Sequence, residues 1–420
     1  MSRRIKLKFI RNLYKVYVDV FPVHIFLIYI LSFLFPRNRK LWVFGGMSGI
    51  LFTDNTKQLF MYINSLKQSQ IKSVWITKDK TIALAIRQMG MRSCYLYSLQ
   101  GLYICLRSGV YIFTHSANDI SFSLSGGSKK INLWHGIPLK KINYDNEYDQ
   151  KRNPHSLVGA MLTFSQRMRK ERPTHYILST SDHVASMFTG TFKIPLNNII
   201  VAGYPRNDVL FSDPFKYLNT TEEINYFNGI YRSEKKEKEI VLVYLPTFRT
   251  PEHEKDIFKH LHLEEFDVAL KELKIRIIFK LHPKSKIKDE FMKYEYTNIS
   301  LAPWSIDPYP LVAASDGLIT DYSSIFFDYL LVDKPMVFFS YDLEDYIKHS
   351  RGLYYDYATF VPGPIVKTQV ELIHTIQDVY LNGQDEYIQK RMHMKNLFFK
   401  HHDGLSSQRL FDEIYRLATK

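Results

Sequence analysis

Residues 319–329 read ITDYSSIFFDY, and this stretch decides the fold expected for the second half of the chain. An apolar, strand-like run over residues 317–320 changes through a polar Asp-Tyr-Ser-Ser junction into an apolar helical run. A strand followed directly by a helix is the repeating step of a parallel α/β sheet. We therefore expect an open α/β fold with its functional side chains in loops at the carboxyl ends of the strands.

The same alternation of short β-rich runs and helical intervals extends in both directions from this stretch. A polar, charge-rich interval at residues 212–238 interrupts it and is the expected linker between a domain at 41–211 and one at 239–420. Two α/β domains of ordinary size suit a chain of 420 residues. The predicted strands are residues 41–44, 74–77, 110–114, 131–133, 176–180, 199–202, 239–245, 276–281, 299–301, 317–320 and 335–339.

The composition narrows the class of protein. Two cysteines, Cys94 and Cys105, provide neither a disulfide framework nor a four-ligand metal cluster, so no metal is expected. The formal net charge of +14 predicts anionic partners, which include nucleic acid, phosphorylated substrates and anionic membranes. No recognised nucleic-acid motif is present, so we do not expect nucleic acid among the partners.

Residues 1–40 combine basic side chains with an apolar run, Val23 to Phe35, which lies between Pro22 and Pro36. The run is shorter than the roughly 20 residues that a spanning helix needs, and both of its flanks are basic. No small-residue cleavage site of a signal peptide follows it. We expect a short helix that lies on an anionic membrane surface, with a buried core helix and a true span as the alternatives.

A candidate base follows the predicted strand at 131–133, where residues 132–141 read NLWHGIPLKK. His135 next to the permissive Gly136 can take a proton from an attacking hydroxyl, while the lysines behind it offset phosphate charge. The alternative is a loop histidine that packs on Trp134. One histidine alone does not decide between them.

Residues 203–208 read GYPRND and are expected to form a turn directly after the predicted strand at 199–202. Asn207 and Asp208 are candidate substrate-binding residues there. A structural ion pair between Arg206 and Asp208 is the alternative, and it is favoured because turns of this composition are common without a ligand.

Basic groups end two predicted strands of the second half, in PTFR (246–249) and KLHPK (280–284). Arg249 can bind two phosphate oxygens at once, and His282 can donate a hydrogen bond or a proton to a leaving phosphate. Lys280 adds a further positive charge at the same strand end. All three are therefore predicted to face a phosphorylated ligand.

The junction at 320–324 is the most informative of these strand ends. Ser323 and Ser324 stand where a helix begins, so their hydroxyls and the free amides of the first turn can hold a phosphate. A plain N-cap is the alternative, because serine is favoured at helix starts in any case. A later loop, RGLYYD (351–356), is expected to close over the ligand. The candidates from both loops are Thr320, Asp321, Ser323, Ser324, Arg351 and Asp356.

Taken in order, six motifs resemble those of the CDP-glycerol glycerophosphotransferase family, the teichoic acid primases and polymerases. The resemblance extends from about residue 41 to the C-terminus, and six ordered motifs are far more specific than one. It implies a GT-B fold, in which two Rossmann-like domains face a cleft and no cofactor is needed. The motifs are WHGxPLK (134–140), GYPRND (203–208), PTFR (246–249), KLHP (280–283), TDYSS (320–324) and RGxYxD (351–356).

The resemblance also implies roles for individual residues. His135 matches the family's proposed catalytic base, and His282 lies among the positions around the donor phosphates, together with Arg249, Ser323 and Ser324. Arg351 and Asp356 would complete that pocket. One departure is Ile137, since family members usually carry threonine there and a lost hydroxyl could alter acceptor contact.

The expected reaction transfers glycerol phosphate from CDP-glycerol to a lipid-linked acceptor, with release of CMP. The enzyme would act as a peripheral protein on the cytoplasmic face of a bacterial cell membrane. A transferase of the same build that uses CDP-ribitol, or that makes a capsule polymer, is the alternative within the enzyme class. A non-catalytic membrane scaffold is a further alternative, but it leaves the two strand-end histidines without a purpose.

Overall fold

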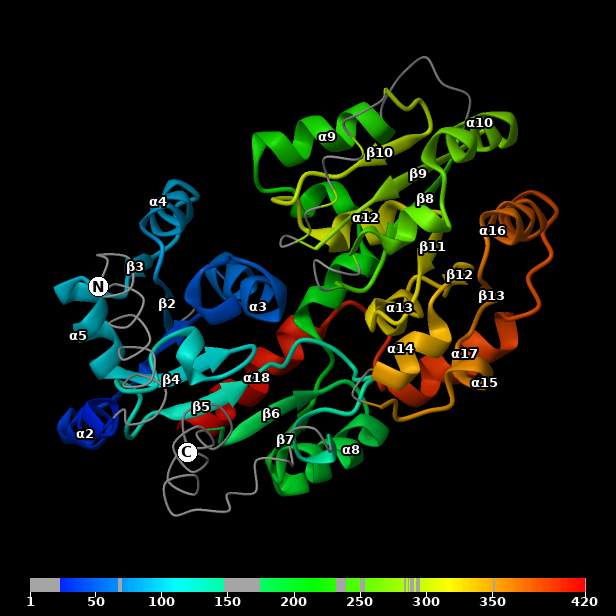
Figure 1. Cartoon of the computed structure of the whole chain (residues 1–420). Coiled ribbons are helices and arrows are strands. Elements are labelled where there is room, and N and C mark those ends of the chain that lie inside the picture. The colour runs from blue at the N-terminus through cyan, green and yellow to red at the C-terminus, as the bar shows by residue number, and fades with distance from the viewer. Residues whose placement is uncertain are drawn as a thin grey trace, which may run out of the picture. The chain divides into compact units, whose positions relative to one another are not determined.

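The computed structural model describes residues 23–66, 70–146, 174–231, 239–249, 254–282, 285, 287, 291, 295–349 and 352–419. The chain forms two compact units, each built on a parallel sheet (Figure 1). Unit 1 comprises Met1–His135, Asn143–Arg206 and Leu405–Lys420. Unit 2 comprises Gly136–Ile142 and Asn207–Gly404.

The sheet of unit 1 has seven strands in the order β3-β2-β1-β4-β5-β6-β7, all paired in parallel. Strand order reverses between β1 and β4, which is the switch point where parallel α/β sheets bind ligands at the carboxyl edge. Buried apolar residues fill most of these strands, as expected for a sheet covered on both faces. The strands are β1 Asn38–Phe44, β2 Lys72–Thr77, β3 Ser93–Tyr95, β4 Ser108–Phe113, β5 Lys129–Asn132, β6 Tyr176–Ser179 and β7 Ile199–Val201.

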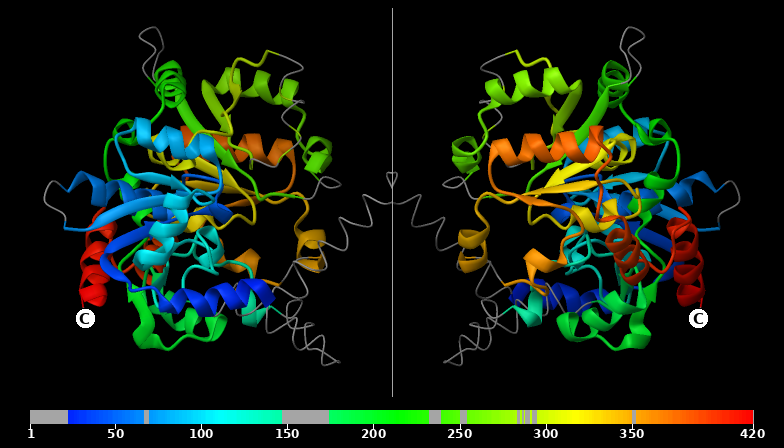
Figure 2. Two further views of the ribbon diagram at one scale, coloured as in Figure 1. Left: turned by 90° about the vertical axis from the view of Figure 1, so that its left-hand side faces the viewer. Right: turned by 90° about the vertical axis from the view of Figure 1, so that its right-hand side faces the viewer.

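The last helix of the chain belongs to unit 1, although unit 2 precedes it in sequence. Phe411 of this helix packs on Trp42 of β1 with 5.8 Å between ring centroids, and the Arg409 side chain donates to the carbonyl of Ala202 at 3.2 Å. Figure 2 shows it in red beside the blue segments of the same unit. The helices of unit 1 are α2 Val23–Leu31, α3 Asp54–Ser65, α4 Lys80–Gln88, α5 Leu99–Arg107, α8 Asp182–Phe192 and α18 Ser406–Thr419.

The sheet of unit 2 has six parallel strands in the order β10-β9-β8-β11-β12-β13. Its order reverses between β8 and β11, so this sheet has a switch point of the same kind as unit 1. The strands are β8 Ile240–Leu245, β9 Ile275–Phe279, β10 Ile299–Leu301, β11 Gly317–Thr320, β12 Met336–Phe339 and β13 Ile365–Val366.

Two helical segments of unit 2 lie inside the expected linker. Residues 212–238 were predicted to connect the domains, but η7 (Pro214–Tyr217) and α9 form there and belong to unit 2. The Glu222 carboxylate accepts a hydrogen bond from the Ser305 hydroxyl at 2.8 Å, which ties α9 to this unit. The helices are α9 Thr221–Tyr231, α10 Leu263–Leu273, α12 Pro308–Ala314, α13 Ile325–Tyr329, α14 Leu343–His349, α15 Tyr357–Phe360, α16 Gln369–Ile376 and α17 Ile388–Phe398.

The apolar segment near the N-terminus has one packed side and one exposed side. Tyr29 stacks on Phe122 with 4.5 Å between centroids, and Phe26 meets the same ring at 5.7 Å. Among the described residues no helix has the length and apolarity needed to cross a membrane. The opposite side of α2 and of η1 (Ser32–Leu34) exposes Leu27, Ile28, Ile30, Leu31, Phe33 and Leu34, and Phe35 continues it.

The α/β class with two parallel sheets, predicted from the alternation of strands and helices, is confirmed. Every predicted strand is present, with ends that differ by a few residues, while β3 and β13 were not predicted. The chain passes between the units at residues 135–136, 142–143, 206–207 and 404–405, whereas the sequence placed a single division at 212–238 and ended the second domain at 420. Residues 1–22 of the predicted membrane segment lie outside the described residues.

We predict that Gly229→Ala stabilises the protein. Gly229 lies inside α9 with open space where a Cβ would project, so alanine gains helix propensity without a clash. The expected gain is about 0.5–1 kcal/mol, measured as a higher midpoint of thermal unfolding.

Gly317→Ala is the matched control, because a Cβ there overlaps the Tyr380 hydroxyl at the start of β11. It should destabilise by about 1–3 kcal/mol. An unchanged midpoint for Gly229→Ala would mean that residues 221–231 are not a stable helix.

Candidate functional site

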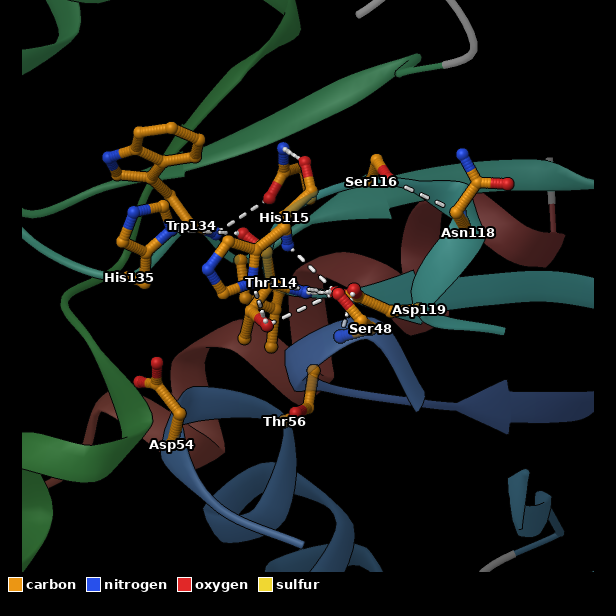
Figure 3. A network of polar contacts seen from close by, with 12 residues as sticks. Ser48, Asp54, Thr56, Thr114, His115, Ser116, Asn118, Asp119, Trp134 and His135 are labelled. Carbon is orange, nitrogen blue, oxygen red and sulfur yellow. Dashed lines mark hydrogen bonds and ion pairs between the residues drawn. The ribbon is translucent and has the colours of Figure 1, made fainter. Parts of the chain in front are cut away.

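At the switch point of unit 1, one buried carboxylate joins the loops that follow β1 and β4 (Figure 3). Asp119 Oδ1 accepts the amide of Ser48 at 2.8 Å. Asp119 Oδ2 accepts the amides of Thr114 and His115 at 3.1 and 2.9 Å. Burial opposes its charge, but these donors and the His115 ring hold the pKa of Asp119 below its ordinary value. The carboxylate therefore fixes both loops at this edge of the sheet.

His135 lies on the loop after β5, as predicted, and its ring is partly exposed. It stacks on the ring of His115 with 4.2 Å between centroids and also contacts Trp134 at 4.0 Å. Burial, then the positive charge of a protonated His115, lowers the pKa of His135 to about 3. The imidazole is consequently neutral at pH 7 and has a lone pair available for a proton.

Residues from two separate segments, the start of α3 and the turn after β7, hold the backbone around His135. Asn55 donates its side-chain amide to the carbonyls of Leu133 and Trp134 at 3.3 and 3.0 Å. Arg206 donates to the carbonyl of His135 at 2.9 Å and forms an ion pair with Asp54 at 2.8 Å. Arg206 of the GYPRND turn thus supports the histidine loop, a role that the sequence did not reveal.

At the switch point of unit 2, the buried Asp321 joins the loops after β8 and β11 in the same manner. Asp321 Oδ1 accepts the amide of Thr247 at 2.8 Å, and Oδ2 accepts from the Arg249 guanidinium at 2.8 Å. Arg249 also binds both oxygens of Asp342 at 2.9 Å. Burial opposes the charge of Arg249, but the two carboxylates raise its pKa further. Arg249 is therefore held between two carboxylates. Its contact with a donor phosphate stays a prediction.

Lys280 and His282, predicted side by side after β9, lie in different surroundings. Lys280 is buried, and its ammonium donates to the carbonyls of Pro303 and Trp304 at 2.7 and 3.1 Å. Burial lowers its pKa to about 8. His282 is exposed and packs on Phe248 at 4.7 Å. Lys280 shapes the neighbouring loop, while His282 is accessible to a ligand.

The polar junction after β11 is partly exposed, as a ligand-binding loop requires. Ser324 precedes α13 without a side-chain cap, and Ser323 Oγ accepts the Ile325 amide at 3.5 Å. Their hydroxyls are thus not committed to strong capping bonds. Thr320 differs, because it is buried and donates to the carbonyl of Leu245 at 2.7 Å.

Two of the predicted motifs pair with one another inside unit 2. The Lys141 amide donates to the carbonyl of Gly352 at 3.0 Å, and the Tyr354 amide donates to that of Leu139 at 3.0 Å. Asp356 is exposed and accepts from Thr359 at 2.9 Å. Arg351 lies outside the described residues. The lysine loop after Gly136 and the RGLYYD loop therefore act as one structural feature.

The remaining predicted positions are buried. The Asn207 amide donates to Asp328 at 3.1 Å, and Asp208 is also buried. Ile137, where the family usually carries threonine, is 1% exposed and contributes packing. Across the described part of the chain, no group of three or more His, Cys, Asp or Glu side chains is arranged to hold a metal ion.

Sequence reasoning missed His115, Asp119 and Asp342. Each follows a predicted strand, at 110–114 or 335–339, so the logic that selected His135 applied to them as well. A histidine four residues before an aspartate at a strand end was the available signal.

Known proteins are similar to this chain over nearly its whole length. The teichoic acid glycerol-phosphate transferase of Staphylococcus aureus (strain NCTC 8325 / PS 47) is 27% identical over 90% of this chain and 94% of its own. The teichoic acid ribitol-phosphate primase of Bacillus spizizenii (strain ATCC 23059 / NRRL B-14472 / W23) is 27% identical over 93% and 94%. The structure of the wall teichoic acid polymerase TagF shares the fold, with a TM-score of 0.74 at 22% identity over 99% of this chain and 97% of that one.

Residues 27–416 match the family described as CDP-Glycerol:Poly(glycerophosphate) glycerophosphotransferase. The family predicted from six ordered motifs is thereby confirmed. With its two Rossmann-like sheets and its strand-end histidine, this chain belongs to the CDP-glycerol:poly(glycerophosphate) glycerophosphotransferase family.

Proposed function

We propose that this enzyme moves glycerol phosphate from CDP-glycerol to a membrane-linked teichoic acid or related polymer acceptor and releases CMP. The observation that carries the proposal is His135 at the carboxyl edge of a parallel sheet, with its ring stacked on His115 and its carbonyl held by Arg206, in a chain of this family. Unit 1 binds the acceptor and unit 2 binds the donor. An acceptor hydroxyl attacks the β-phosphorus, its proton passes to His135, and the bond from that phosphorus to CMP breaks.

The remaining groups of the site stabilise the negative charge of the donor phosphates. Ser323, Ser324 and the exposed His282 contact the donor phosphates, and Arg249 keeps positive charge at the end of β8. An anionic substrate beside His135 raises the basicity of its ring during the reaction, because a nearby negative charge favours the protonated form. Positioning and electrostatics then provide most of the rate enhancement.

CDP-ribitol is the second candidate donor, since a ribitol-phosphate primase is 27% identical to this chain, the same identity as the glycerol-phosphate transferase. Incubation with each nucleotide and a lipid-linked acceptor, followed by measurement of CMP release, decides between them. Release from neither donor would reject the proposed reaction.

His135→Ala should abolish transfer and leave donor binding intact. Loss of a general base lowers the rate by about 10²- to 10⁴-fold. The measurement is CMP release with acceptor present, with donor affinity from calorimetry.

His282→Ala is the companion variant and should weaken donor binding as well as turnover, because His282 belongs to unit 2. Near-normal CMP release by a folded His135→Ala protein would remove His135 as the base.

Arg249→Ala should weaken CDP-glycerol binding by about 1.5–3 kcal/mol if the guanidinium contacts the donor. Asp342→Asn separates this role from a purely structural one, because it weakens two carboxylate contacts of Arg249 and retains Asp321. Calorimetry should give weaker binding for Arg249→Ala and equal or tighter binding for Asp342→Asn. Unchanged donor affinity in folded Arg249→Ala would place Arg249 outside the pocket.

The exposed side of α2 and η1 is proposed to dock the enzyme on the cytoplasmic face of an anionic membrane. Deletion of residues 1–40 is a poor test, since Phe26 and Tyr29 pack in the core of unit 1 and β1 begins at Asn38. Replacing two outward side chains, Ile30→Ser with Leu34→Ser, retains that packing.

The double variant should bind anionic vesicles at least about tenfold more weakly, because each aliphatic side chain adds roughly 1.5–3 kcal/mol when fully buried. The matched control is Val370→Ser with Ile388→Ser, which removes two aliphatic residues of unit 2 that are also more than half exposed. Equal loss of vesicle binding in co-sedimentation of both double variants would contradict docking through α2.

A further inference from the structure

A second histidine lies against the proposed base, and the proposed reaction gives it no role. The rings of His115 and His135 are nearly parallel, with 15° between planes and 4.2 Å between centroids. They come from the loops after β4 and β5, neighbouring strands in which Phe113 pairs with Asn132. Figure 3 shows the two rings side by side, with Asp119 on the far side of His115.

Hydrogen bonds fix the orientation of His115. Its Nδ1 lies 3.1 Å from the Thr114 hydroxyl and 3.8 Å from Asp119 Oδ2. The same hydroxyl donates to Asp119 Oδ2 at 3.2 Å, so its oxygen accepts a hydrogen bond from Nδ1 of His115. A proton of His115 therefore lies on Nδ1 and points to the Thr114 hydroxyl, which in turn donates to the Asp119 carboxylate.

The charges around the pair favour a proton on His115 over one on His135. Burial opposes the charge of His115, but Asp119 and then Asp54 raise its pKa above the ordinary value. Burial lowers the pKa of His135 most, the charges of His115 and of Arg206, which donates to its carbonyl, lower it further, and Asp54 raises it. Two imidazolium rings at this separation repel, so protonation of one disfavours protonation of the other.

We propose that His115, anchored through Thr114 and Asp119, is a positioning residue that holds the His135 ring by stacking and takes the proton of the resting pair, so that His135 is unprotonated before the acceptor hydroxyl attacks. The role deepens the proposed function, since it concerns the base of the same reaction. As pH falls, His115 takes the proton first and His135 stays able to accept one from the acceptor hydroxyl. Without His115, the proton goes to His135 and transfer stops at a higher pH.

His115→Phe is the informative variant, because phenylalanine retains the stacked ring and removes the charge. Removal of a neighbouring positive charge raises the pKa of His135, so the acid limb of the kcat/KM profile should move to higher pH. A shift of one pH unit lowers the rate on that limb about tenfold relative to wild type, with the plateau near pH 8 little changed. The control is His183→Phe on α8, another partly exposed histidine of unit 1.

Titration of the histidine rings by NMR in the full-length protein gives a readout independent of transfer. An upward shift of the His135 titration in His115→Phe, absent in His183→Phe, supports the pairing, and an unshifted titration overturns it. A shifted titration with an unchanged rate profile overturns the role of His115 in transfer and removes His135 as the base. If His135→Ala is inactive but the His135 titration does not shift in His115→Phe, this inference is rejected and the proposed function stands.

Discussion

A buried carboxylate at the switch point of each sheet is the interaction on which the functional loops depend. Strands diverge there, so the first amides after them lose their ladder partners and need another acceptor. Asp119 accepts amides from the loops after β1 and β4, and Asp321 accepts an amide and a guanidinium from the loop after β8. Hydrogen bonds to a charged group each contribute about 1.5–3 kcal/mol, enough to hold a short loop in one conformation.

Different functional side chains lie next to the two carboxylates. Asp119 accepts a hydrogen bond from the Thr114 hydroxyl, which also contacts His115, and His115 stacks on His135. The carboxylate therefore lies beside a pair of titratable rings. Asp321 ends at Arg249, whose charge Asp342 shares. One sheet therefore presents a pair of stacked histidine rings, and the other an arginine held between two carboxylates.

The strands were predictable because most are continuous apolar runs bounded by polar or glycine residues, as at 317–320. Ser93–Tyr95 and Ile365–Val366 were missed because they are too short to form a pattern. Charge density at 232–238 suggested a linker, but the amphipathic run before it folds as α9 on unit 2. The site residues followed from strand ends, whereas the partners of Arg249 and the stacking of His115 depend on contacts distant in sequence, which no local pattern specifies.

The return of α18 to the first unit has a consequence for the order in which the chain folds during synthesis. Trp42 meets Phe411 only after the whole of the intervening residues 207–404 has been synthesised. Unit 2 is contiguous from Asn207 to Gly404 and can form its sheet earlier. The unit that carries His135 therefore stays incomplete until α18 has been synthesised, and a chain truncated before Leu405 lacks part of that core.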